Sequence, residues 1–149
     1  MTDPSGPSRD ADEERLGDDA PSPAIADPAP RWLIDLRRAA HRRGFYQSLG
    51  DYALQFTDRG SDHLVVSFDN LSSAREETIA RDPWGYGFAA KNGWSQLGVL
   101  AFRPEWFRDE ALFGALRNLE RQGFFARFKS VTMTGTSMGG YAACAFSGL

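Results

Sequence analysis

The chain has 149 residues, an ordinary apolar and aromatic content, a formal net charge of −3 and a single cysteine, Cys144. This length suits one domain with a buried core, and a lone cysteine excludes an internal disulfide. The first seven residues have neither the bases nor the apolar run of a secretory signal. No stretch approaches the roughly 18 apolar residues of a membrane span. We therefore expect a cytoplasmic protein without a membrane segment.

Residues 1–30 differ in composition from the rest of the chain. They hold eight acidic residues, two basic residues and six of the eight prolines. Their few apolar side chains cannot offset the entropy lost on ordering, which predicts a disordered acidic tail followed by one domain over residues 31–149. We interpret the tail as a solubilising leader. Loose attraction to the mildly basic domain is the alternative.

The first predicted elements are a helix and two strands. Apolar residues recur at helical spacing between Pro30 and Gly44, which predicts a helix that Gly44 ends. Its arginines lack interleaved aromatic residues and a docking motif, so they indicate a solvated helix face and no nucleic-acid partner. A short strand follows over residues 52–56, then a turn over 59–62. Residues 63–68 are almost continuously apolar, as in a strand buried on both faces of a parallel sheet.

The remaining elements alternate between helix and strand. The pattern predicts a short helix over residues 84–92, a second buried strand over 95–102, an amphipathic helix over 108–122, a third strand over 129–134 and a helix from Ser137 onward. Such alternation favours right-handed β-α-β units. The predicted fold class is therefore α/β, with a parallel β-sheet between helices on both faces in three α/β/α layers.

The most specific segment of the chain is the glycine-rich turn after the third strand, which reads Gly135-Thr136-Ser137-Met138-Gly139. A serine hydroxyl is a poor nucleophile unless a base removes its proton and donors await the oxyanion. A tight strand-to-helix turn exposes the serine oxygen and directs a helix N-terminus at the developing charge. Such a turn requires small residues two positions before and after the serine. The alternative is a turn whose glycines serve only packing.

Residues 131–146 resemble the nucleophile elbow of serine esterases, lipases and acyltransferases of the α/β-hydrolase superfamily, and the resemblance extends over about residues 60–149. It implies a partial α/β-hydrolase fold and a small-molecule ester or acyl substrate. It also implies that Ser137 is the nucleophile, that the backbone N–H of Met138 is one oxyanion donor, and that a backbone N–H near Asn70 is the second. The loop that holds Asn70 reads Asp-Asn-Leu, where the superfamily typically has a His-Gly sequence.

The partners of such a serine do not follow it in the sequence. The superfamily supplies its acid and its histidine after the nucleophile. None of the twelve residues after Ser137 is Asp, Glu or His, and the two histidines, His41 and His63, lie upstream. We therefore expect a truncated α/β-hydrolase-like chain that has little or no turnover alone. The alternative is a non-catalytic binding protein that keeps a partial hydrolase scaffold.

No other pattern predicts a metal site or a cofactor. One cysteine and two distant histidines do not have zinc-site spacing. The glycine turn lacks the lysine of a phosphate-binding loop, and no dinucleotide fingerprint follows the first buried strand. Aromatic residues gather between positions 84 and 107. These rings either line an acyl or sugar pocket or cover the core.

Overall fold

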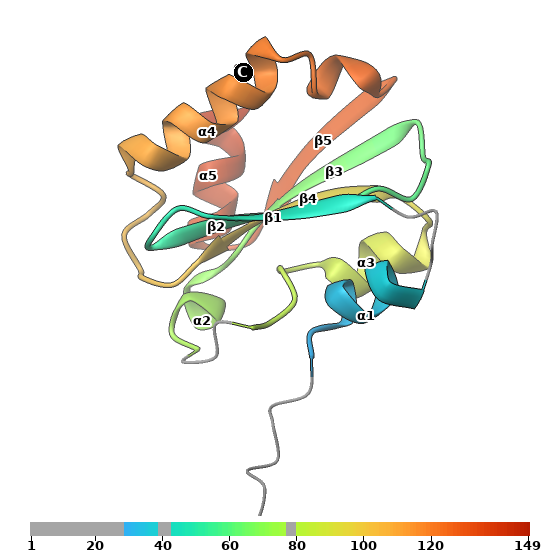
Figure 1. The fold of residues 1–149 in the computed structure, drawn as a ribbon. Helices are drawn as coiled ribbons and strands as arrows, with labels where there is room; N and C mark the ends of the chain where they lie inside the picture. The colour runs from blue at the N-terminus through green and yellow to red at the C-terminus, as the bar shows by residue number, and fades with distance from the viewer. Residues whose placement is uncertain (1–28, 39–42, 77–79) are drawn as a thin grey trace, which may run out of the picture.

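A computed structural model describes residues 29–38, 43–76 and 80–149. These residues form a mixed α/β fold, in which a five-stranded sheet lies between helices on its two faces (Figure 1). The predicted α/β class and flanking helices are therefore confirmed. The predicted acidic tail, apart from residues 29 and 30, lies outside the described residues, and so does His41.

The sheet is mixed, so the prediction of a parallel sheet is wrong. Its spatial order is β1-β2-β4-β3-β5, and β2 runs antiparallel to both of its neighbours, whereas β4, β3 and β5 are parallel. A parallel connection needs about a dozen residues or more. Only residues 49–51 join β1 to β2, and only residues 58–62 join β2 to β3, so the chain reverses at both places. The strands are β1 (Gly44–Ser48), β2 (Tyr52–Thr57), β3 (His63–Phe68), β4 (Ser95–Ala101) and β5 (Ser130–Gly135).

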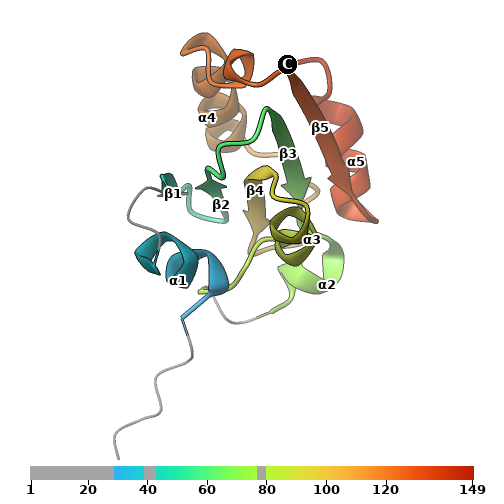
Figure 2. The same cartoon turned by 90° about the vertical axis from the view of Figure 1, so that its right-hand side faces the viewer.

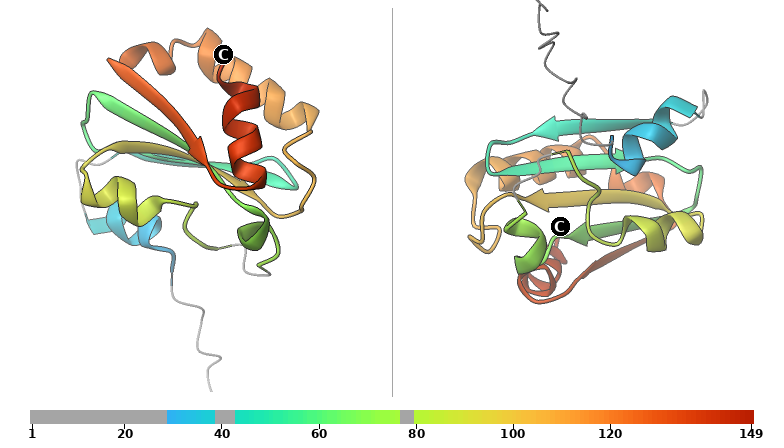
Figure 3. Two further views of the ribbon diagram at one scale, coloured as in Figure 1. Left: turned by 180° about the vertical axis from the view of Figure 1, so that it is seen from behind. Right: turned by 90° about the horizontal axis from the view of Figure 1, so that it is seen from below.

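The helices are divided between the two faces of the sheet (Figures 2 and 3). α4 and α5 cover one face, and α1 and α3 cover the other, with the short α2 beside the ends of β3 and β4. From β3 onward, strand and helix alternate as the sequence predicts. The helices are α1 (Arg31–Arg38), α2 (Leu71–Ala74), α3 (Tyr86–Lys91), α4 (Glu110–Arg121) and α5 (Met138–Phe146), with a 3-10 turn at Phe125–Arg127.

β1 is the element that the sequence does not reveal. Gly44 was expected to end the first helix, but it begins β1 and pairs with Thr57 of β2. A Cβ on Gly44 would lie 2.3 Å from the backbone oxygen of Phe56. Position 44 is therefore glycine because the two strands approach closely there. The described part of the helix ends earlier, at Arg38.

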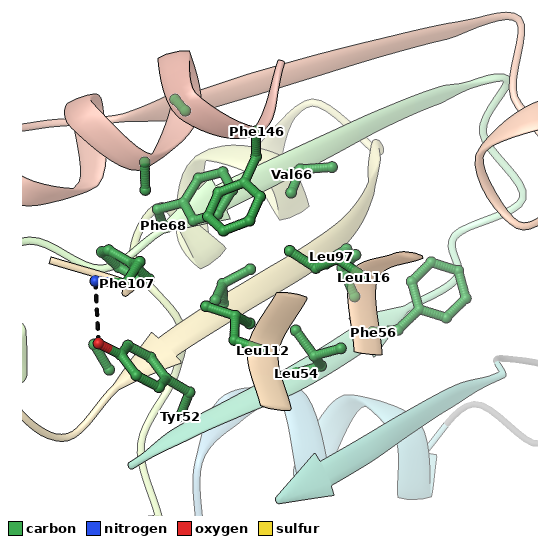
Figure 4. Packing of buried hydrophobic residues seen from close by; sticks show 14 of the residues in the cluster. Tyr52, Leu54, Phe56, Val66, Phe68, Leu97, Phe107, Leu112, Leu116 and Phe146 are labelled. Carbon is green, nitrogen blue, oxygen red and sulfur yellow. Dashed lines mark hydrogen bonds between the residues drawn. The ribbon is translucent and has the colours of Figure 1, made fainter. Parts of the chain in front are cut away.

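The main hydrophobic core lies between the sheet and the α4–α5 layer (Figure 4). The rings of Phe68 and Phe146 stack there with centroids 5.6 Å apart. The backbone N–H of Phe107 donates to the buried hydroxyl of Tyr52 over 3.0 Å. That bond holds a turn in which Trp106 and Phe107 both have positive φ angles, 58° and 59°. Alternate residues of three strands supply this face, namely Tyr52, Leu54, Phe56, Leu64, Val66, Phe68, Leu97, Val99 and Ala101.

The face beneath α1 and α3 buries more polar groups. Tyr86 of α3 is almost fully buried, donates its hydroxyl proton to Asp35 of α1 over 2.5 Å, and has the Arg59 guanidinium 4.9 Å above its ring. Burial, together with the hydrogen bond to Asp35, raises the pKa of Tyr86 to about 12. The strands contribute buried polar side chains to this face as well, namely Gln55, Thr57, Ser67 and Gln96.

Candidate functional site

Ser137 lies in the tight turn between β5 and α5, two elements that are adjacent in Figure 1. Its backbone has φ 54° and ψ −124°, a conformation that side-chain-bearing residues rarely adopt. The turn is closed by a hydrogen bond from the Gly139 N–H to the Thr136 carbonyl, 2.9 Å long. Ser137 is exposed, whereas Met138, the first residue of α5, is fully buried. The serine hydroxyl is therefore accessible to solvent at a strained turn in front of a helix.

The two glycines that flank the serine have steric reasons to be glycine. A Cβ on Gly135 would lie 2.4 Å from the carbonyl carbon of Gly139. A Cβ on Gly139 would lie 2.4 Å from the Phe68 carbonyl oxygen and 2.7 Å from that of Asp69. All of these neighbours are backbone atoms and cannot rotate away. The turn thus packs directly on the end of β3, and any side chain at either position would push α5 off the sheet.

Asn70 comes to the same edge of the sheet because β3 and β5 are parallel neighbours, with Phe68 paired to Gly135. Asn70 caps α2, since its Oδ1 accepts from the Ser73 N–H over 2.9 Å. Its Nδ2 lies 3.5 Å from the Thr136 hydroxyl. All three residues that the sequence predicts for the site, Ser137, Met138 and Asn70, therefore belong to two adjacent segments.

The connections after β3 and β5 leave toward opposite faces of the sheet. The segment after β3 leads to α2 and α3, and the segment after β5 leads to α5 on the other face (Figure 2). Open α/β sheets bind their ligands at the carboxyl ends of neighbouring strands whose connections diverge in this way. Ser137 and Asn70 flank this point.

A buried ion pair fixes the loop that carries Asn70, and the sequence did not reveal it. Oδ2 of the fully buried Asp69 accepts from the Arg81 guanidinium over 2.6 Å and from the Ala101 N–H over 2.9 Å. Oδ1 accepts from the Trp84 N–H over 3.0 Å. Arg81 also donates to the Ala101 carbonyl. With three donors on its carboxylate, Asp69 has a structural role, and no local pattern links it to an arginine twelve positions later.

His63 lies far from Ser137. It begins β3 opposite Ser130, which begins β5, and its Nδ1 lies 2.5 Å from the Ser130 hydroxyl. A six-residue strand, at about 3.3 Å per residue, puts its two ends about 17 Å apart. Among the described residues, no hydrogen bond joins the Ser137 side chain to a His, Asp or Glu. In residues 29–38, 43–76 and 80–149, the serine hydroxyl is thus not hydrogen-bonded to a base.

An apolar cavity lies beside β3 and β5, on the face that α3 partly covers. Its volume is about 410 Å³. Trp84 and Phe88 form its rim, and Phe88 is 61% exposed. Of the aromatic residues between positions 84 and 107, Trp84 and Phe88 line this cavity, whereas Tyr86 and Phe107 are buried in the protein. Val65, Ser67, Gly85 and Thr134 complete the lining.

Comparison of the chain with models of protein families, with curated proteins and with solved structures found no match. Within the part of the chain that the structure describes, no helix is long and apolar enough to cross a membrane. In the same part, no three His, Cys, Asp or Glu side chains come close enough together to hold a metal ion.

Proposed function

We propose that Ser137 is the nucleophile of an ester-hydrolysis or acyl-transfer site of the α/β-hydrolase type. The observation that carries this proposal is the positive φ of Ser137 at the turn from β5 to α5. A serine in this conformation costs on the order of 1–3 kcal/mol relative to a relaxed backbone, and such strain concentrates at functional sites. The glycines at 135 and 139, which admit no side chain, support the same reading.

The chemistry follows from the groups around the turn. The Ser137 oxygen would attack the carbonyl carbon of an ester, and the carbonyl oxygen would become an oxyanion. The backbone N–H groups of Met138 and Asn70 would donate to that oxyanion, and the N-terminus of α5 would add its positive dipole. The hydroxyl proton must pass to a base, and the alcohol of the ester leaves as the acyl-serine forms.

The described residues supply no such base at Ser137, so we expect a slow reaction. Loss of triad members typically lowers the turnover number by about 10⁴- to 10⁶-fold. An oxyanion hole by itself still gives about 10³- to 10⁴-fold over the reaction in water. The chain should therefore acylate or phosphonylate Ser137 selectively while it turns over esters poorly.

A second candidate function is non-catalytic binding on the same scaffold. The absence of a hydrogen-bonded base among the described residues favours it, and so does the apolar cavity beside β5. The two functions predict different reactivities for the Ser137 hydroxyl. A nucleophilic serine requires neighbouring groups that activate its hydroxyl, whereas a binding scaffold does not.

The two can be distinguished by labelling the full chain with an aryl fluorophosphonate and locating the adduct by peptide mass spectrometry. Exposed serines of the same protein serve as internal controls, namely Ser72 in α2 and Ser147 at the end of α5. We expect Ser137 to react about 10³-fold faster than either control. Equal rates at Ser137 and Ser147 would refute an oxyanion hole at the turn and leave the binding scaffold.

A further inference from the structure

A serine and a histidine face each other where β3 and β5 begin. The two strands are parallel neighbours, and His63 pairs with Ser130 in their register. His63 Nδ1 lies 2.5 Å from the Ser130 hydroxyl oxygen. A serine becomes nucleophilic when a base within hydrogen-bond reach can take its proton. Ser130 therefore has a hydrogen-bonded base, which Ser137 does not have in the part of the chain that the structure describes.

The backbone on both sides of this pair is fixed by hydrogen bonds. The His63 N–H donates to the Ser61 hydroxyl over 3.0 Å. The N–H groups of Lys129 and Ser130 both donate to the Asp62 carbonyl, over 2.8 and 3.3 Å. The strand ends that carry the two side chains are therefore held in register.

The imidazole also contacts the ring of Trp94. The two rings meet edge to face, with centroids 4.9 Å apart and planes at 67°. A base that a third group orients belongs to the usual arrangement around a nucleophilic serine. In the tautomer with its proton on Nε2, the imidazole Nδ1 accepts the hydrogen bond from the Ser130 hydroxyl. Ser130 is exposed, so a substrate can reach its oxygen.

The apolar cavity beside β3 and β5 lies on the same face of the sheet as this pair. Side chains alternate along a strand, so Val65, which lines the cavity, lies on the same face as His63. Two residues of a strand span about 7 Å. Phe88 lines the cavity as well, and its ring centroid lies 5.6 Å from that of Trp94. Apolar side chains thus lead from the cavity to the imidazole.

We infer that Ser130 and His63 form a second nucleophilic site, which accepts the acyl group of an ester whose apolar acyl chain lies in this cavity. The imidazole Nδ1 takes the hydroxyl proton as the Ser130 oxygen attacks the ester carbonyl carbon. The bond from that carbon to the alcohol oxygen then breaks, and the alcohol leaves with the proton from the imidazole. The products are acyl-Ser130 and the free alcohol.

The hydrogen bonds around the pair determine how large the effect should be. A positioned general base contributes about 10²- to 10⁴-fold. The N–H groups of Lys129 and Ser130 are already bonded to Asp62, so neither is free to stabilise an oxyanion. We therefore expect Ser130 to be acylated about 10²-fold faster than an exposed serine without a base, at the lower end of that range.

The first test is acylation of the full chain by p-nitrophenyl acetate. A Ser137→Ala background makes the result independent of the elbow, and mass spectrometry with fragmentation assigns the acetyl group to single residues. Ser72, an exposed serine in α2, is the internal control. Ser130 should be acetylated about 10²-fold faster than Ser72. His63→Gln keeps a hydrogen-bond acceptor but no base, and should reduce the rate at Ser130 to that at Ser72.

Equal rates at Ser130 and Ser72 in the chain that retains His63 would overturn the inference, and this comparison needs no histidine variant. So would a rate at Ser130 that stays high in His63→Gln, once circular dichroism has shown that this variant folds.

The second test concerns the acyl chain. A butanoyl group has two more methylenes than an acetyl group, and burial of each methylene should raise the rate about fourfold. We therefore expect p-nitrophenyl butanoate to acylate Ser130 about 10-fold faster than the acetate, relative to the same ratio at Ser72. Equal ratios at Ser130 and Ser72 would exclude the cavity as the place of the acyl chain.

Discussion

Substitution of Gly139 by alanine tests the close packing of the elbow on β3. The added Cβ would lie 2.4 Å from the Phe68 carbonyl oxygen, whereas carbon and oxygen atoms in favourable contact are about 3.3 Å or more apart. The backbone must therefore move by nearly 1 Å. Overpacking of this kind costs about 1–3 kcal/mol, against a gain of about 0.5–1 kcal/mol for alanine over glycine in a helix. Two backbone carbonyls that cannot rotate away place the cost near the upper end of this range, at about 3 kcal/mol, so we expect a net loss of about 2 kcal/mol.

Gly114 provides the matched control. It also lies inside a helix, α4, but no atom lies within 4 Å of the Cβ position. Gly114→Ala should therefore stabilise the protein by about 0.5–1 kcal/mol. Urea unfolding followed by circular dichroism measures the change in unfolding free energy of both variants. In thermal unfolding, a loss of 1 kcal/mol lowers the melting temperature by about 4 °C, so that of Gly139→Ala should fall by about 8 °C. A loss below about 0.5 kcal/mol for Gly139→Ala would show that the elbow does not pack this closely on β3.

Three further outcomes follow from strain, charge and burial. Ser137→Gly should unfold with a free energy about 1 kcal/mol higher than Ser137→Ala, since only glycine relieves the positive φ; equal denaturation midpoints would contradict the strain. Arg81→Met leaves the buried Asp69 carboxylate without its positive partner, and should lower the free energy of unfolding in urea by about 3 kcal/mol. The control Arg103→Met removes an exposed ion pair and should lower it by less than about 1 kcal/mol. Because the pKa of Tyr86 is raised to about 12, the unfolded chain loses this proton first, so stability should decline as pH rises from about 10 to about 12; a Tyr86→Phe variant that shows the same decline would rule out this origin.

The sequence predicted the elements whose local signals are strong. The almost continuous apolar run from His63 to Phe68 is a strand with those bounds, and the apolar stripe around Leu112 and Leu116 lies on a helix. The glycines at positions 135 and 139 predict a tight strand-to-helix turn between them, because such a turn leaves no room for a side chain at either position. These features depend on spacing within a few residues, which a single sequence contains.

The features that were missed depend on contacts between distant segments. β1 is only five residues long and mostly exposed, so it lacks a clear alternation of buried and exposed side chains. The antiparallel direction of β2 could have been inferred from its short connections but not from its composition. The Asp69–Arg81 pair joins two loops that approach each other only after β3 and β4 have paired.

The Asp69 carboxylate also lies between the apolar cavity and the elbow. It holds the backbone of Trp84, which forms the rim of the apolar cavity, and it directly precedes Asn70 at the elbow. The backbone N–H of Asp69 itself donates to the Val99 carbonyl of β4. A single buried carboxylate therefore fixes both a wall of the cavity and the backbone next to Asn70, so its loss would loosen both places.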